Sequence, residues 1–114
     1  MTVAIAQDHH TYSITSNMIE TFNRATGEPE NITTANSLIA VPYVQATIHE
    51  ALRAEPHTFL AQSLKFRRDV FDGDTLRPST TVVSRSGNQI VLATTVYNQE
   101  NTVVLDCETV VELR

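Results

Sequence analysis

The chain has 114 residues and a formal net charge of −5, with eight lysine and arginine residues against thirteen aspartate and glutamate residues. This length predicts a single domain, and the 41% of hydrophobic residues indicates a globular chain. The negative balance argues against nucleic acid as a partner, since binding a phosphate backbone needs a positive surface. The single cysteine, Cys107, excludes an internal disulfide and favours a reducing, cytoplasmic setting.

No apolar run reaches the roughly 20 residues that a membrane span needs, so no membrane partner is expected. The opening MTVAIAQDHH also lacks the basic and apolar regions of a signal peptide. Residues 1–10 are predicted to form a flexible N-terminal arm, and residues 11–114 a single domain.

The first part of the domain is predicted to hold a short strand at Tyr12–Ile14 and then a helix. Thr15 and Ser16 offer an N-cap, and Gly27 is suited to end the helix because it tolerates a left-handed backbone. Pro29 then prevents the helix from resuming. The apolar residues of this helix follow helical spacing: Met18, Ile19, Phe22 and Ala25.

A second helix is predicted over Pro42–Ala54, because proline is favoured in the first helical turn and Pro56 closes the segment. Its apolar residues recur at i, i+4, i+7 and i+8: Val44, Ile48, Ala51 and Leu52. Such a stripe faces a core. This helix is the only one that is apolar and long enough to cover a sheet.

After His57 the hydrophobic period changes from helical to alternating. The predicted strands are Phe59–Val70, Leu76–Ser84, Gln89–Asn98 and Thr102–Leu113. Short turns separate them, and in the Asp72-Gly73-Asp74 corner glycine accepts a positive φ while the aspartates bond their own backbone. The expected architecture is α+β: two helices, then a four-stranded antiparallel meander wrapped around the Pro42–Ala54 helix. Because its edges would be bare, we expect pairing with a second subunit.

Three stretches with these elements resemble the MaoC-like branch of the hotdog superfamily, which comprises (R)-specific enoyl-thioester hydratases and 3-hydroxyacyl-thioester dehydratases. YSITSNMIETFNRATGEPENI is similar to the family's opening strand, first helix and the start of its catalytic loop. LKFRRDVFDGDTL is similar to its F..PVFPGDTL strand and turn, and TTVYNQENTVVLDCETVVEL to its closing hairpin. Together they span nearly the whole chain from Tyr12.

The resemblance implies an acyl thioester, carried on acyl carrier protein or CoA, as the ligand, and it implies no further cofactor and no metal. The acyl chain would enter along the central helix, between two subunits. Backbone N–H groups at the N-terminus of that helix would polarise the thioester carbonyl, which suits the positive end of a helix dipole. The corresponding positions here are Val41, Pro42 and Tyr43, of which Pro42 has no N–H to donate.

The chain departs from the family in its catalytic loop. The family's motif is Gly-Asp-x-Asn-Pro-x-His, whereas this chain has GEPENIT from Gly27 to Thr33. Glu28 occupies the aspartate position and Thr33 the histidine position, and threonine cannot act as a base near neutral pH. Asn31, one place out of step with the family's asparagine, is a candidate substrate-binding residue.

Three residues are therefore candidate acid–base groups: Glu28, His49 and Glu50. Glu28 shares its loop position with the family's acid, or is a solvated residue at a helix end. His49 and Glu50 lie on opposite flanks of the apolar stripe of the second helix. Each is either a surface residue or an assistant at the acyl site, as the glutamate of a central helix is in other hotdog branches.

Three further features have mainly structural interpretations. His57 is expected to cap or pack at the end of the second helix, and Cys107 to be inert core on the inward face of the last strand. The basic cluster Lys65-Phe66-Arg67-Arg68 is split between two faces of its strand, so it indicates a solvated sheet face or a docking point for a phosphate-bearing carrier.

The sequence leaves three functions open. The first is reversible hydration or dehydration of an acyl thioester in fatty-acid or polyketide-type metabolism, with a rearranged acid–base set. The second is a non-catalytic acyl-binding subunit of a heterodimeric dehydratase, which the missing histidine favours. The third is a thioesterase in which Glu28 or Glu50 activates water.

Overall fold

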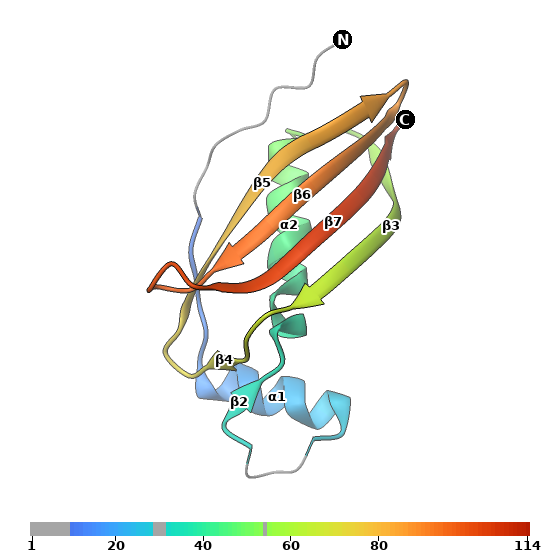
Figure 1. Cartoon of the computed structure of the whole chain (residues 1–114). Coiled ribbons are helices and arrows are strands. Elements are labelled where there is room, and N and C mark those ends of the chain that lie inside the picture. The colour runs from blue at the N-terminus through green and yellow to red at the C-terminus, as the bar shows by residue number, and fades with distance from the viewer. Residues whose placement is uncertain (1–9, 29–31, 54) are drawn as a thin grey trace.

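The computed structural model describes residues 10–28, 32–53 and 55–114. It contains an α-helix α1 (Ser16–Thr26), a 3-10 helix η1 (Ser37–Ala40) and an α-helix α2 (Val41–Ala51) (Figure 1). The strands are β1 (Tyr12–Ser13), β2 (Thr34–Ala35), β3 (His57–Phe66), β4 (Val70–Phe71), β5 (Thr75–Ser86), β6 (Gln89–Tyr97) and β7 (Val103–Leu113). A five-stranded antiparallel sheet has the order β1-β5-β6-β7-β3, and β2 pairs separately with β4.

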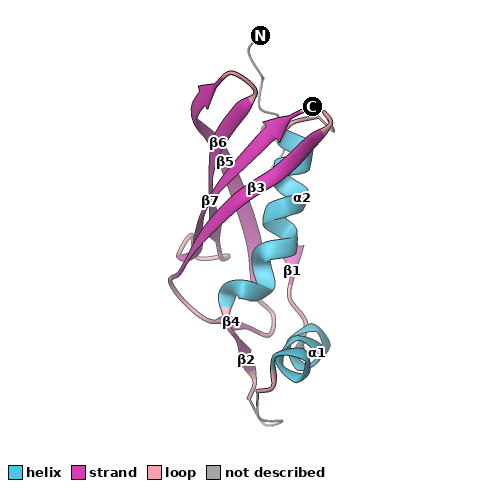
Figure 2. Cartoon of the chain, turned by 90° about the vertical axis from the view of Figure 1, so that its right-hand side faces the viewer, coloured by secondary structure: helices cyan, strands magenta, loops and turns pink. Residues whose placement is uncertain are grey.

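The sheet curves around α2, as Figure 2 shows from the side. Val44 and Ile48 are 0% exposed and Leu52 is 1% exposed. They belong to a core that includes inward-facing residues of the sheet: Leu76, Ile90, Leu92, Val96, Leu105, Cys107 and Val111. Fully burying such a side chain stabilises the fold by about 1.5–3 kcal/mol. The predicted α+β arrangement, a hotdog sheet wrapped around one central helix, is confirmed.

The first helix also agrees with the sequence prediction. The backbone N–H of Met18 donates to Thr15 Oγ1 at 3.2 Å, so Thr15 is the N-cap. Gly27 has a φ of 81° and ends α1 in the left-handed region. Met18 and Phe22 pack against the core, and α1 lies across one end of the molecule (Figure 2).

The central helix differs in its bounds from the predicted Pro42–Ala54. α2 spans Val41–Ala51 and continues directly from η1, so the helical rod begins at Ser37. Asn36 starts this rod, because the backbone N–H of Leu38 donates to Asn36 Oδ1 at 2.9 Å. At the other end Arg53 has a φ of 54°, which stops the helix, and Ala54 lies outside the described residues. No helix in the described part of the chain has the length and apolar character needed to cross a membrane.

The predicted four-stranded meander is wrong in one respect. Only β5, β6 and β7 form a meander; β3 lies beside β7, not beside β5. The predicted strand Phe59–Val70 is also divided, because the backbone N–H groups of Arg67 and Arg68 both donate to Val104 O and take the chain out of the ladder. Val70 and Phe71 then pair with Ala35 and Thr34 as β4. The other three strands lie within two residues of their predicted bounds.

The Asp72-Gly73-Asp74 corner joins β4 to β5 and is hydrogen-bonded to several other segments. Gly73 has a φ of 88°, as the prediction required. The buried Asp74 accepts hydrogen bonds from the Phe71 N–H at 2.9 Å and from Gln99 Nε2 at 2.9 Å. Ile14 exchanges backbone hydrogen bonds with Gly73 and Asp74. The corner therefore fixes β1 and the β6–β7 turn to one end of the sheet, a wider role than a bend between two strands.

Residues 1–9 of the predicted arm lie outside the described residues. His10, its last residue, is exposed, and its Nε2 lies 3.2 Å from Glu50 Oε2 near the end of α2.

Two segments leave sheet edges open. Among the described residues β3 pairs only with β7, and three large apolar residues of β3 are 40–50% exposed: Phe59, Leu60 and Phe66. β1 pairs with β5 only at Thr75 and Leu76, and among the described residues no other strand pairs with that edge of β5, where Val83 is 56% exposed. A long apolar edge favours pairing with another chain, and β3 is the stronger candidate because its exposed side chains are larger.

We expect the chain to form a dimer through β3, and Leu60→Lys to convert it to a monomer because a lysine at the edge disfavours strand pairing. Size-exclusion chromatography with light scattering measures the change. Val83→Lys is the matched control, since it places the same charge on the competing β5 edge. A wild-type monomer, or dissociation by Val83→Lys alone, would contradict an interface at β3.

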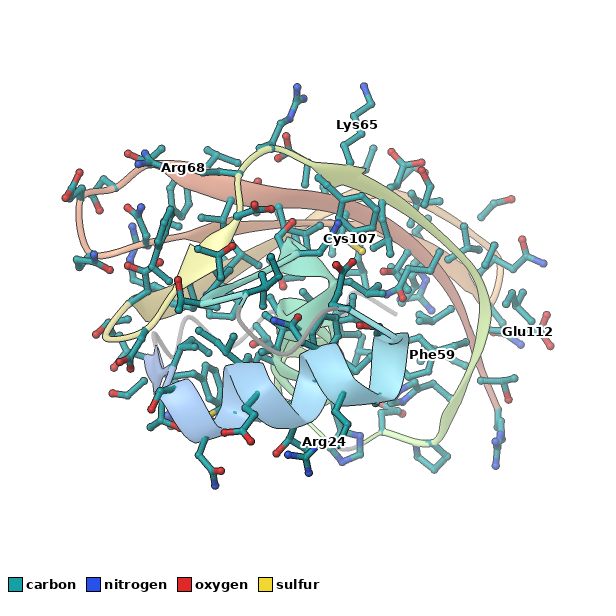
Figure 3. All side chains as sticks on the ribbon, turned by 90° about the horizontal axis from the view of Figure 1, so that it is seen from below. Arg24, Phe59, Lys65, Arg68, Cys107 and Glu112 are labelled. Carbon is teal, nitrogen blue, oxygen red and sulfur yellow. The ribbon has the colours of Figure 1, made fainter. Side chains whose placement is uncertain are left out.

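Cys107 lies on the helix-facing side of the sheet, opposite to Lys65, which points outward (Figure 3). Burial raises the pKa of its thiol above the ordinary value of 9.0, and hydrogen bonds from Thr109 and Gln62 oppose this effect in part. Cys107 Sγ lies 3.4 Å from Thr109 Oγ1. The neutral thiol is therefore the form that the fold stabilises.

We expect Cys107 to react with a chromogenic thiol reagent at least about tenfold more slowly in the native protein than in denaturant, because the thiol is buried and protonated. A folded-state pKa above the unfolded one stabilises the protein below pH 9.0, and this contribution is lost as the pH rises through the folded-state pKa. Urea unfolding at several pH values measures that loss, with Cys107→Ala as the control that lacks it. Equal reaction rates in both states would contradict the prediction.

Candidate functional site

A cavity of about 290 Å³, here called the polar cavity, lies between the end of α1 and the segments around β2 and β4. Its walls combine carboxylate, carboxamide and hydroxyl groups with a few apolar side chains. It is lined by Phe22, Asn23, Thr26, Glu28, Ile32, Thr34, Asn36, Leu38 and Asp69. A cavity of this size has room for several water molecules of roughly 30 Å³ each, and so for the polar part of a small ligand.

A second cavity of about 460 Å³, here called the apolar cavity, lies between α1 and the start of α2. It is lined by Asn17, Met18, Thr21, Phe22, Ala25, Leu38, Ile39, Pro42 and Tyr43. Most of these side chains present carbon and sulfur to the space. Its volume lies in the range of small-molecule sites in proteins, which are mostly apolar with a few polar groups.

Phe22 and Leu38 line both cavities, so the two spaces adjoin at these side chains. Leu38 is 38% exposed although it is a large apolar residue. The pair of cavities therefore offers one space for a hydrocarbon chain and, next to it, a space with groups that can transfer protons.

The predicted site residues near the first half of α2 and the loop after α1 fall at these cavities. Glu28 lines the polar cavity, and Pro42 and Tyr43 line the apolar one. Val41 packs against the core, and its N–H donates to Leu38 O. That N–H is thus used inside the helical rod, whose free positive end lies at Ser37 instead.

Tyr43 forms part of the wall with Tyr12 of β1. Their rings stack with centroids 4.3 Å apart. Burial raises the pKa of the Tyr43 hydroxyl, and the neighbouring Tyr12 raises it further. Tyr43 is therefore a neutral, amphipathic wall residue at neutral pH and not a base.

The structure does not bring the other two candidate acid–base residues to the cavities. His49 and Glu50 are exposed near the C-terminal end of α2, about 10–12 Å along the helix from Pro42 at 1.5 Å per residue. The ring of His49 lies 5.6 Å from that of His57, and Glu50 pairs with His10. His57 Nδ1 lies 2.6 Å from Glu55 O, in agreement with the structural role expected for it. Neither His49 nor Glu50 lines either cavity.

Asn31, the remaining candidate, lies outside the described residues, as do its neighbours Pro29 and Glu30.

Two residues of the polar cavity, Asn23 and Asp69, were not predicted from the sequence. Asn23 is only 4% exposed and sits four residues after the buried Ile19. The sequence did carry a signal for Asn23, since it is a polar residue on the apolar face of a predicted helix. Asp69 gave no signal of its own, because only the β2–β4 pairing places it near α1.

Lys65, Arg67 and Arg68 of the basic cluster are all exposed, and Arg67 Nε donates to Asp106 Oδ2 at 2.8 Å. Across residues 10–28, 32–53 and 55–114, no group of three or more His, Cys, Asp or Glu side chains is arranged to hold a metal ion.

Comparison with protein-family models finds no match, and comparison with curated proteins finds none. Solved structures do match. The unliganded R-hydratase PhaJ1 from Pseudomonas aeruginosa is 22% identical, with a TM-score of 0.79 over 96% of this chain and 81% of that one. The (R)-hydratase from A. caviae involved in PHA biosynthesis is 16% identical, with a TM-score of 0.78 over 97% of this chain and 96% of that one.

A third match is the ChsH1–ChsH2 complex from Mycobacterium tuberculosis, at 16% identity and a TM-score of 0.75 over the whole of both chains. At these identities the likeness shows the fold. The chain is a hotdog-fold protein, and the solved structures similar to it include MaoC-like (R)-hydratases.

Proposed function

We propose that this chain binds an acyl thioester, carried on acyl carrier protein or CoA, and interconverts its 3-hydroxyacyl and enoyl forms. The observation that carries the proposal is the pair of adjoining cavities at the start of the helical rod. The apolar cavity suits the hydrocarbon chain, and the polar cavity suits the carbons that gain or lose water. The similarity to two (R)-hydratases supports the same reaction class.

Glu28 is the proposed acid–base residue, because it lines the polar cavity from the loop that ends α1. Its backbone N–H donates to Asn23 O at 2.8 Å, which fixes the residue against the helix end. The start of the helical rod, beside Asn36 and Leu38, provides a positive dipole end for the oxygen of the thioester carbonyl. Pro42 and Tyr43 serve as walls for the acyl chain, and His49 and Glu50 have no part in the proposed chemistry.

A non-catalytic acyl-binding subunit is the second candidate. The loop from Gly27 to Thr33 has no histidine, and no histidine lines either cavity in the described part of the chain. The similar ChsH1–ChsH2 structure is a complex of two named components, which supports pairing with a different subunit. This candidate predicts no turnover by the chain alone and turnover after mixing with a hotdog subunit that carries an aspartate–histidine pair.

A direct assay separates these functions. We expect the purified chain to convert an enoyl thioester to its 3-hydroxyacyl form, and Glu28→Gln to lower kcat by roughly 100-fold or more because it removes a general acid–base group. Loss of the enoyl absorbance measures the reaction, and Glu20→Gln, on the exposed face of α1, is the matched control. Release of free thiol instead would indicate a thioesterase. If the chain catalyses neither reaction, both enzymatic functions are excluded for the chain alone.

We expect the chain-length preference to depend on the apolar cavity. Ala25→Leu adds three carbons to its wall from the exposed side of α1, so it fills part of the space that a long acyl chain would occupy. KM should rise by about tenfold for long-chain thioesters and change little for short ones, since each displaced methylene is worth about 0.8 kcal/mol. Ala46→Leu, on the exposed side of α2 and away from the cavity, is the control. An equal effect on all chain lengths would contradict this placement.

A further inference from the structure

One edge of the main sheet is covered over only part of its length. β1 pairs with β5 at Thr75 and Leu76, and within the described ranges no other strand pairs with that edge. Farther along β5 lie Val82 and Val83, which are 40% and 56% exposed although both are apolar. An open edge with exposed apolar side chains favours the addition of a further strand. The register of β1 indicates which segment of the chain can reach it.

The backbone of β5 has the orientation that a longer strand on this edge requires. The Ile14 N–H donates to Asp74 O at 2.8 Å, on the side of β1, whereas the Thr75 N–H donates to Gln99 Oε1 on the opposite side. Because successive N–H groups point to opposite sides of a strand, those of the even-numbered residues of β5 are directed at the open edge. This holds as far as Val82, after which the register between β5 and β6 shifts.

Pro78 explains why β1 is short. When the register of β1 is continued backwards, one residue for one residue, His10 falls opposite Pro78. Proline has no N–H, so the ladder loses a bond at this position, and β1 accordingly begins only at Tyr12. The edge is interrupted there but not closed, because the N–H groups of Thr80 and Val82 follow on the same side.

The last described residues before β1 run toward this part of the edge. Tyr12 stacks on Tyr43 of α2, and His10 Nε2 lies 3.2 Å from Glu50 Oε2, seven positions further along the helix. Going backwards from Tyr12, the chain therefore advances toward the C-terminal end of α2, which is also the direction of β5 (Figure 1). Tyr12 and His10 both face the helix, as alternate residues of one strand do.

The sequence before β1 suits the open edge. Thr2-Val3-Ala4-Ile5-Ala6 combines three β-branched residues with two alanines, and β-branched residues are enriched in strands. In the continued register Ala6 falls opposite Val82, and Ile5 falls opposite Val83. Each of the two exposed apolar residues of β5 would thus meet an apolar residue across the strands.

A pair of opposite charges supports the same register. Asp8 would face α2, since it lies two residues before His10 on the same side of the strand. Arg53 is exposed just beyond the end of α2 and forms no ion pair with any residue that the structure describes. Two residues of a strand advance by about 6.6–6.8 Å, and the three positions from Glu50 to Arg53 by about 4.5 Å. The long arginine side chain can span the difference.

We propose that residues 4–8 form a strand on the open edge of β5, in the register of β1, so that they cover the two exposed valines and pair Asp8 with Arg53. This differs from the flexible arm that the sequence predicts for residues 1–10. The chain's own segment is the occupant because its tether at Tyr12 fixes the register and gives it a high effective concentration. With this edge covered, β3 remains as the edge open to a partner chain. The proposal does not depend on the catalytic function proposed above.

Disulfide trapping tests the register. In a Cys107→Ala background, Ala6→Cys with Val82→Cys places two cysteines opposite each other, whereas Ala4→Cys with Val82→Cys, the matched control, offsets them by two residues. Opposite residues of this kind lie about 5.5 Å apart and diagonal ones about 7–8 Å, and a disulfide requires Cα atoms roughly 4.4–6.8 Å apart. With oxidised glutathione as the oxidant, we expect the first pair to close within one chain at least about tenfold faster than the control, measured by mass spectrometry and non-reducing gels.

The other outcomes of this experiment contradict the proposal. Similar rates for the two pairs, or no disulfide in either, would show that the segment does not follow the register of β1. A disulfide that joins two chains would assign the edge to the same segment of a second copy, and would overturn the proposal as well. Thermal unfolding of the reduced variants shows whether both are folded.

Hydrogen exchange provides a test without cysteines, for use if a cysteine variant does not fold. In the proposed strand the Ala6 N–H is directed at Val82 and the Gln7 N–H points away from β5, because N–H groups alternate. Ala6→Pro should therefore release the strand and raise the exchange rate of the Val82 amide at least about tenfold, whereas Gln7→Pro should change it little. An unchanged rate in Ala6→Pro, or an equal rise in both variants, would overturn the proposal.

Discussion

The burial of one helical stripe inside a curved sheet determines where everything else in this molecule lies. Val44, Ile48 and Leu52 are almost wholly removed from water against inward residues of β5, β6 and β7. The sheet wraps one side of α2, and α1 lies across the end at which the helical rod starts, where Ser37, Ile39 and Ala40 are buried (Figure 2). The apolar cavity lies between α1 and the rod, and the polar cavity lies between the end of α1 and the segments around β2 and β4, so the position of α1 on the core determines both.

A second set of contacts holds α1 and the loop after it against the sheet. Asp74 links the β4–β5 corner to Gln99 in the β6–β7 turn, and the backbone of Ile14 bonds to the same corner just before α1 begins. Asn23 ties α1 to β2, which pairs with β4. The buried polar side chains of Asn23 and Asp74 thus join segments that are distant in sequence, and Glu28 and Asp69 line one cavity.

The fold alone does not decide the chemistry, because one scaffold can host different reactions according to the side chains at its site. Here the residues at the polar cavity are carboxylates and carboxamides, and the histidine expected of the family is absent. The proposed hydration chemistry therefore relies on the carboxylate of Glu28 and not on a histidine at this cavity. The identity of a partner chain could also differ from one hotdog protein to another. A chain paired with the β3 edge, identical or different, would cover the exposed apolar residues of that edge.

The sequence by itself determined the features that depend on neighbouring residues. The caps at Thr15 and Gly27, the buried stripe of α2 and the alternation of β6 and β7 were all predictable, since each is set within a few positions of the chain. Only the tertiary structure decided that β3 lies beside β7, that Val70 and Phe71 leave the main sheet, and that Asn23 and Asp69 line the cavity of Glu28. Those outcomes depend on which distant segments share a hydrogen-bond ladder, and periodicity along the chain carries no information about that choice.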